Sequence, residues 1–277
     1  MIVGVINGYY RSGTTFMQRL CRKSNPNFIV LCEPTQHEII DHIMANGCNN
    51  YNLLHGWDVF KDYCRLPRAV KHKFIRRHFE VFDNDKKQWG VMTSAGSVRH
   101  LLQPLHDCEQ PIVVKSTQLQ LFLDDIKEWY GCWVLHLDRS VENIVADHLT
   151  YSTLTTTDEA KKLLLSDKES LSFYADLVFE NLTRCFGVDK SIARHNLDKL
   201  VFNILATKKA VNGQKGVVVI DFDDFIANPY QHLDKLPFKV DESLLRLIDP
   251  HKSNPRPKWL VDAVNDSIRH VKNVTGW

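Results

Sequence analysis

The sequence predicts a three-layer α/β/α fold, in which helices cover both faces of a central parallel sheet. Over the 277 residues, short apolar runs alternate with longer segments of helical periodicity. The apolar runs are continuous and rich in β-branched residues, which is typical of strands buried on both faces. Strands that alternate with helices are joined by right-handed crossovers. We find no internal repeat or low-complexity segment, and we expect a single domain that spans residues 1–277.

The apolar runs and the helical segments give the expected order of elements. The predicted strands cover Ile2–Ile6, Phe28–Cys32, Pro111–Val114, Cys132–Leu137 and Val217–Ile220. The predicted helices run from Thr14 to about Arg22 and over Glu38–Ala45, Asn143–His148, Ala160–Ser166, Leu171–Cys185, Ile192–Ala210 and Leu260–Val271.

Composition sets limits on the class of protein. A hydrophobic content of 44% and a charged content of 25% are ordinary for a globular protein with one core, and no membrane association is indicated. A net charge of +2 gives no overall nucleic-acid footprint. Seven cysteines without CxxC spacing, and histidines without HxxxH or HExxH spacing, predict no metal site. The chain opens in its first strand, so we expect neither a signal peptide nor an anchor, and a cytoplasmic protein.

A glycine-rich loop follows the first strand. Residues Gly8 to Thr15 have the spacing of a phosphate-binding P-loop, GxxxxGK(S/T), in its required strand–loop–helix context. Thr14 replaces the lysine that reaches the terminal phosphates of ATP, and Arg11 supplies the cation instead. Loop amides and a helix N-terminus bind an anion without that lysine, and the planar arginine fork can contact two oxygens together. Alternatively, the segment is a turn in which Thr14 or Thr15 caps the helix.

Charged residues follow the strands. The first four strands are followed by Arg11, Glu33, Lys115 and Arg139, and the last by the acidic run 221–224. Ligands of open parallel sheets bind beyond the carboxyl ends of the strands. A site with several cations and one carboxylate is suited to the transfer of an anionic group to a hydroxyl or an amine. Alternatively, each charge marks a strand end that meets solvent.

Four blocks of the sequence, in order, resemble the sulfotransferases. The loop resembles the family loop that carries Lys or Arg before Ser-Gly-Thr-Thr, and the Glu33-Pro34 pair resembles the Glu-Pro segment of carbohydrate sulfotransferases. The other two blocks are the strand 134–139, which ends in Arg139, and the segment 219–229, which ends in Asn-Pro. The resemblance implies a P-loop-like sulfotransferase fold and a nucleotide co-substrate, 3′-phosphoadenosine 5′-phosphosulfate (PAPS).

The resemblance also implies roles for single residues. The expected contacts to the 5′-phosphosulfate come from Tyr10, Arg11, Ser12, Gly13, Thr14 and Thr15. Arg11 and Lys115 are expected to stabilise charge during transfer, Glu33 to act as the general base, and no metal to take part. The family's cytosolic members have a histidine base where Thr117 stands, which makes Glu33 the better candidate for the base. Alternatively, Glu33 pairs with Arg11 or caps a turn before Pro34.

The 3′-phosphate is expected at Arg139, where the sequence departs from the family. Asp147 stands where the family has a serine, so the companion contact is expected from Ser140, His148 or Ser152. Alternatively PAPS is not the ligand, or Asp147 is an exposed helix position without a role. A basic segment at Arg256 stands where relatives bring cations to this phosphate.

The segment of about 37–107 is expected to be a helical insertion on the acceptor side. It contains the aromatic residues Trp57, Tyr63 and Trp89. It also carries a basic stretch at Arg65, Arg68, Lys71, Lys73, Arg76 and Arg77. This stretch could hold an acidic sugar, or it could be only a solvated helix face.

The sequence therefore predicts a nucleotide-binding transferase that moves a sulfuryl group from PAPS to a hydroxyl, in preference to an amine, of a small molecule or glycan such as a carbohydrate. An ATP-dependent phosphotransferase is an alternative, with Asp221–Asp224 and Thr15 as Mg²⁺ ligands. Otherwise, Asp223 or Asp224 caps the following helix. A second alternative is a catalytically silent relative that acts as an interaction module. The acceptor and the oligomeric state stay open.

Overall fold

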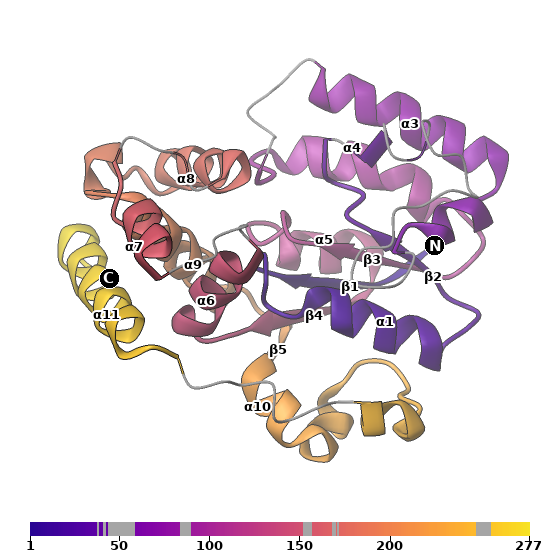
Figure 1. Ribbon diagram of the computed structural model, residues 1–277. Coiled ribbons are helices and arrows are strands. Elements are labelled where there is room, and N and C mark those ends of the chain that lie inside the picture. The colour runs from indigo at the N-terminus through magenta and orange to yellow at the C-terminus, as the bar shows by residue number, and fades with distance from the viewer. Residues whose placement is uncertain are drawn as a thin grey trace.

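The fold is a five-stranded parallel sheet flanked by helices, which confirms the predicted three-layer α/β/α class (Figure 1). The computed structural model describes residues 1–37, 39–40, 43, 59–83, 90–151, 157–167, 170, 172–247 and 256–277. The strands are β1 (Ile2–Gly8), β2 (Ile29–Cys32), β3 (Ile112–Ser116), β4 (Trp133–Asp138) and β5 (Val218–Asp221). Their order in the sheet is β2-β3-β1-β4-β5.

The register of the sheet sets which strand ends are neighbours. Lys115 of β3 is aligned with Cys32 of β2, the residue before Glu33. On the other side, Lys115 is aligned with Ile6 of β1, two residues before the loop begins. Asp138 at the end of β4 is aligned with Asp221 at the end of β5. The charged residues predicted to follow the strands therefore lie along one edge of the sheet.

Helices cover both faces of the sheet and form a separate group beside it. The α-helices are α1 (Thr14–Ser24), α3 (Arg68–Phe82), α4 (Ala95–His106), α5 (Leu123–Tyr130), α6 (Val141–Tyr151), α7 (Thr157–Leu164), α8 (Phe173–Phe186), α9 (Asn196–Asn212), α10 (Phe222–Ala227) and α11 (Lys258–Thr275). The 3-10 helices are η2 (Lys61–Arg65), η4 (Lys190–Ile192), η5 (Pro229–Lys235) and η6 (Glu242–Leu247).

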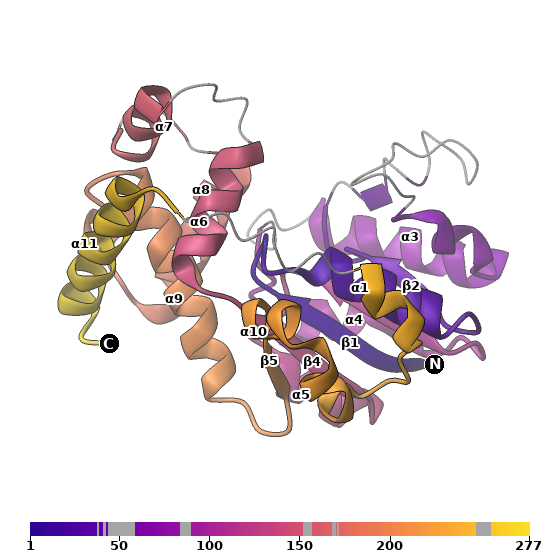
Figure 2. The same cartoon turned by 60° about the horizontal axis from the view of Figure 1, so that its bottom comes forward.

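Three apolar clusters correspond to these layers. One joins β2 and β3 to α3, α4 and α5, and a second joins the opposite face of the sheet to α1 and α10. The third packs α6, α8, α9 and α11 together. These last helices gather at one end of the molecule (Figures 1 and 2). Within 37–107, the predicted insertion, α3 and α4 help to cover a face of the sheet rather than lying apart from it.

The structure corrects several predicted helices. The sequence reasoning did not predict α5, and it predicted α3 and α4 only as part of a helical segment of about 37–107 without bounds of their own. Ile192 lies in η4, and α9 begins later, at Asn196, because the backbone amide of Asp198 is capped by the His195 side chain. Leu171 lies outside the described residues, and α8 begins at Phe173 after its cap Ser172. Most of the predicted helix 38–45 also lies outside them. Of the helices described, none is both long and apolar enough to cross a lipid bilayer.

Candidate functional site

The loop between β1 and α1 has a backbone suited to close approach of a ligand. The Ser12 amide donates to the Tyr9 carbonyl at 2.9 Å, and Gly13 has a φ of 93°. A Cβ atom at Gly13 would lie 2.4 Å from the Phe222 ring, so only glycine fits. Because Gly13 is the N-cap of α1, the alternative of capping by Thr14 or Thr15 is wrong. Both threonines lie in the first turn of the helix. Backbone N–H groups in this turn have no acceptor within the helix and point outward from its N-terminus.

The Arg11 side chain lies over an aromatic ring of the loop itself, that of Tyr10. Its guanidinium carbon is 4.4 Å from the centroid of the Tyr10 ring, and its Nη2 donates to the Tyr10 hydroxyl at 3.1 Å. The Tyr10 ring lies 5.4 Å from the His148 ring and 5.5 Å from the Tyr174 ring, both centroid to centroid. Burial, and then the charge of Arg11, lower the pKa of His148 to about 3. His148 is therefore a neutral imidazole beside the Arg11 cation.

Glu33 and Lys115 form a buried ion pair at the ends of β2 and β3. The Lys115 ammonium donates to Glu33 Oε1, and both residues are under a tenth exposed, at 4% and 8%. The Thr117 amide donates to Glu33 Oε2 at 2.9 Å, and the Thr117 hydroxyl lies 3.2 Å from each carboxylate oxygen. Burial alone would lower the pKa of Lys115, but the charge of Glu33 and the hydrogen bond to it, together with weaker charge interactions, raise this pKa overall. Lys115 is thus held as an ammonium cation in this buried position.

Tyr174 of α8 connects the two groups of residues. Its hydroxyl donates to the Gly90 carbonyl at 3.1 Å and lies 3.4 Å from the Thr117 hydroxyl. Burial raises the pKa of Tyr174, so the phenol stays protonated. Contacts therefore run from Arg11 through Tyr10, Tyr174 and Thr117 to the Glu33 carboxylate. The structure brings the three predicted catalytic residues, Arg11, Glu33 and Lys115, to one region.

Backbone conformation marks two of these residues. Arg11 has a φ of 73° and Glu33 a φ of 50°, and among the residues that the structure describes they are the non-glycine residues with positive φ. Non-glycine residues in this region cost about 1–2 kcal/mol each and concentrate at ligand-binding and active sites. Both residues had been selected from the sequence on other grounds, namely charge and position after a strand.

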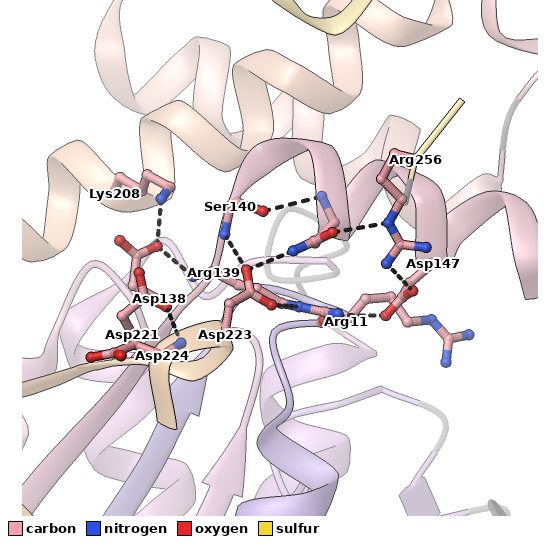
Figure 3. A network of polar contacts seen from close by, with 11 residues as sticks. Arg11, Asp138, Arg139, Ser140, Asp147, Lys208, Asp221, Asp223, Asp224 and Arg256 are labelled. Atoms are coloured by element: carbon pink, nitrogen blue, oxygen red, sulfur yellow. Dashed lines mark hydrogen bonds and ion pairs between the residues drawn. The ribbon is translucent and has the colours of Figure 1, made fainter. Parts of the chain in front are cut away.

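Arg139 lies in a network of ion pairs behind the loop (Figure 3). Its Nε donates to Asp223 Oδ1 at 2.9 Å, and its Nη1 donates to the Arg11 carbonyl at 2.8 Å and to the Asp147 carboxylate. Asp147 also pairs with Arg256, at 3.4 Å. The interpretation of Asp147 as an exposed position without a role is therefore wrong.

The neighbours of Arg139 are also occupied. The Ser140 hydroxyl accepts from the Asn143 amide at 3.3 Å, which caps α6, and the Ser140 amide donates to Asp223. The Asn143 side chain bridges Asp223 and Arg256 at 2.8 and 2.9 Å. Ser152, one of the predicted alternatives to Ser140, lies outside the described residues.

The acidic run after β5 has structural contacts. Asp221 accepts from the Asp224 amide at 3.0 Å and is the cap of α10, so the prediction that Asp223 or Asp224 caps this helix is wrong. Asp224 accepts from Asn228 at 3.1 Å and lies 2.9 Å from His232. Throughout the described part of the chain, no group of three or more His, Cys, Asp or Glu side chains could hold a metal ion.

The predicted acceptor segment contributes structurally where it is described. Tyr63 is buried, and its hydroxyl donates to the carbonyl of Cys32, next to Glu33, at 3.0 Å. Trp57 and Trp89 lie outside the described residues. In the basic stretch, Arg65 donates to the Phe28 and Pro26 carbonyls, Arg76 pairs with Glu80, and Arg77 donates to the His100 carbonyl.

The sequence reasoning did not identify Tyr174 as a site residue. It noted Asp147 only because this residue stands where the sulfotransferases have a serine. Tyr174 meets Thr117, and Asp147 meets Arg256, through contacts between residues far apart in the sequence, which no local motif indicates. Burial of a tyrosine hydroxyl within a helical segment leaves no signature in a single sequence.

Comparison with known proteins leaves the function open. No family model matches the chain. An uncharacterized protein of Archaeoglobus fulgidus is 26% identical over 242 residues, which cover 79% of this chain and 77% of that protein. The functional argument therefore rests on the site.

Proposed function

We propose that this protein is a metal-independent sulfotransferase that moves a sulfuryl group from PAPS to a hydroxyl group of a small molecule or glycan. One observation carries the proposal. A phosphate-type loop without lysine and a buried Glu33–Lys115 pair lie at the carboxyl ends of three neighbouring strands, β1, β3 and β2. The loop with Arg11 suits the phosphosulfate end of a nucleotide, and Glu33 supplies the base that a hydroxyl acceptor needs.

The residues would share the chemistry of an in-line transfer. The bond between sulfur and the bridging oxygen breaks, a bond from sulfur to the acceptor oxygen forms, and the acceptor proton passes to Glu33. Negative charge builds on the bridging oxygen, which stays with the leaving 3′,5′-bisphosphate. Arg11 and the first-turn amides of α1 would stabilise this charge. Protonation of Glu33 also weakens its pair with Lys115, which makes the ammonium charge available to the leaving group.

A catalytically silent relative is the second candidate, because two observations favour it. The Glu33 carboxylate already accepts from Lys115 and from the Thr117 amide and hydroxyl. Arg139 is already paired with Asp147 and Asp223. A protein that used these groups only for stability would show the same contacts.

A titration of the protein with adenosine 3′,5′-bisphosphate, ADP and ATP, with and without Mg²⁺, tests the proposal. At a hundred times the dissociation constant, a ligand stabilises by about 2.7 kcal/mol and raises the melting midpoint by roughly 5 °C or more. We expect this shift with the bisphosphate in the absence of Mg²⁺. A response confined to ATP with Mg²⁺ would instead identify a phosphotransferase.

Release of sulfate from PAPS gives the activity readout. We expect Arg11→Ala to lower this rate by about a hundredfold, the cost of removing a donor that stabilises developing charge. The matched control is Arg19→Ala, which removes an exposed cation from α1 and should leave the rate unchanged. Equal rates for the Arg11 variant and the wild type would remove Arg11 from the mechanism. Nucleotide binding without any sulfate release or transfer would favour the silent relative.

A further inference from the structure

Asp147 presents its carboxylate to two arginines from distant parts of the chain. Arg139 follows β4 and reaches Oδ2, and Arg256 precedes α11 and reaches Oδ1 at 3.4 Å (Figure 3). One carboxylate between two guanidinium groups is the arrangement in which arginines bind a phosphate group. Here a side chain of the protein itself occupies the position of the anion.

Hydrogen bonds within the protein engage about half of the N–H groups of this arginine pair. Arg139 directs Nε to Asp223 and Nη1 to Asp147 and the Arg11 carbonyl. Arg256 directs Nε to Asn143 and Nη2 to Asp147. In the network that these contacts join, two guanidinium groups face two carboxylates, so their charges balance. A phosphate arriving here would have to displace Asp147 and would meet its repulsion.

The arginine pair lies directly against the phosphate-type loop. Arg139 Nη1 donates to the main-chain carbonyl of Arg11 at 2.8 Å, and Arg11 has left-handed backbone at this point. The arginine pair is therefore a group of cations next to the loop, which a second phosphate of a nucleotide bound there could approach.

We propose that the Asp147 carboxylate occupies the anion position between Arg139 and Arg256. The protein therefore binds a nucleotide through its 5′-phosphate group and does not select a second phosphate on the ribose. The inference rests on nucleotide binding at the loop, as in the proposed function, and it names the donor class. An adenosine 5′-phosphosulfate donor is accepted without regard to the 3′-phosphate.

Isothermal titration with adenosine 5′-phosphate and adenosine 3′,5′-bisphosphate tests the inference. For the wild type we expect the two dissociation constants to agree within about threefold, well under the tenfold that 1.4 kcal/mol represents. Asp147→Asn keeps the size of the side chain and removes its charge. It should tighten binding of the bisphosphate by about tenfold or more, the gain expected from one charge-assisted hydrogen bond, and leave the monophosphate unchanged.

Two further variants sharpen the test. Glu142→Gln makes the same change of charge on the same helix, at a residue outside the network of Figure 3, and should alter neither constant. Arg256→Gln added to Asp147→Asn should cancel the gain for the bisphosphate. Melting midpoints report whether each variant is folded.

The outcomes separate this inference from the proposed function. A wild type that already prefers the bisphosphate by more than about tenfold, or an Asp147→Asn variant with an unchanged ratio, overturns the inference and leaves nucleotide binding intact. Absence of binding by either nucleotide to any variant overturns both.

Discussion

At the scale of single residues, Arg11 and Glu33 show how a strained backbone is held in place. Left-handed backbone at a residue with a side chain costs about 1–2 kcal/mol. The Arg11 carbonyl is fixed by Arg139, and the Glu33 carboxylate by Lys115 and Thr117. Each backbone conformation depends on contacts with residues at the ends of other strands. Both residues therefore reach this conformation only when the sheet is assembled.

The Glu33–Lys115 pair gives a prediction about stability and pH. In Glu33→Gln the buried ammonium loses its counter-charge, and breaking a buried pair from one side costs about 3–5 kcal/mol. In the wild type the pKa of Lys115 is raised, so the stability from this group is present below about pH 10.4, its unfolded pKa, and is lost as pH rises through the folded pKa. In the variant, burial without Glu33 should lower this pKa, and stability should then increase with pH.

Urea unfolding of the wild type and Glu33→Gln from neutral to alkaline pH measures both effects. The matched control is the double variant Glu33→Gln with Lys115→Met, which removes the unpaired charge. It should recover much of the lost free energy of unfolding and lose the pH dependence of the single variant. A single variant as stable as the wild type, with the same slope against pH, would show that the ion pair contributes nothing to stability.

At the scale of elements, the contact between the loop, α1 and α10 depends on Gly13. Its φ is 93°, and an added Cβ would lie 2.4 Å from the Phe222 ring of α10. Gly13→Ala should therefore combine left-handed strain of about 1–2 kcal/mol with overpacking of about 1–3 kcal/mol. Because the loop must shift away from Phe222, we also expect weaker nucleotide binding.

Gly187 provides the control for this prediction. It has a φ of 64° at the end of α8, and an added Cβ would meet nothing within 4 Å. Gly187→Ala should therefore show the backbone strain of about 1–2 kcal/mol alone, with unchanged nucleotide binding. Thermal unfolding and nucleotide titration of both variants check the difference. Equal destabilisation by the two substitutions would mean that Phe222 moves aside freely.

At the scale of the whole molecule, the sequence predicted the sheet better than its covering helices. Predicted strands such as Phe28–Cys32 are continuous apolar runs, because a strand that is buried on both faces of a sheet needs apolar side chains at successive positions. Pro104 lies inside α4, where a proline is usually interpreted as a helix break, and the charges of α3 were interpreted only as a basic stretch that could be a solvated helix face. Their apolar faces are defined by packing on the sheet, a tertiary property.

The candidate site, too, was predicted from the sequence only in part. Arg11, Glu33 and Lys115 could be predicted because each lies at or close to the carboxyl end of a strand, and parallel strands place such residues on one edge. The contacts that fix them could not be predicted. Tyr174 comes from α8, and Arg256 comes from the segment before α11. Nothing in the sequence near Glu33 or Asp147 indicates these partners, since they meet only through packing of the helical group.

That helical group has a buried carboxylate, Asp198, which joins α9 to α11. It accepts from Arg194 at 2.8 Å and from the Ser267 hydroxyl of α11. Burial alone would raise the pKa of Asp198, but hydrogen bonds from Arg194 and Ser267 outweigh it and lower this pKa. The stability that Asp198 contributes is therefore present above its unfolded pKa, about 3.9, and is lost as pH falls through the folded pKa.

We therefore expect acid to loosen the contact between α9 and α11. Asp198→Asn should lower the free energy of unfolding at pH 7 by about 2–3 kcal/mol, the value of hydrogen bonds to a charged group. Between pH 5 and about pH 3, the free energy of unfolding should fall less in this variant than in the wild type. The exposed Asp262 of α11 provides the control, because Asp262→Asn changes the same charge outside the Asp198 contacts. Urea unfolding across this pH range checks the prediction. Parallel curves for the wild type and Asp198→Asn would place the acid sensitivity in other carboxylates, of which Asp223, with a pKa also lowered, would be the next to test.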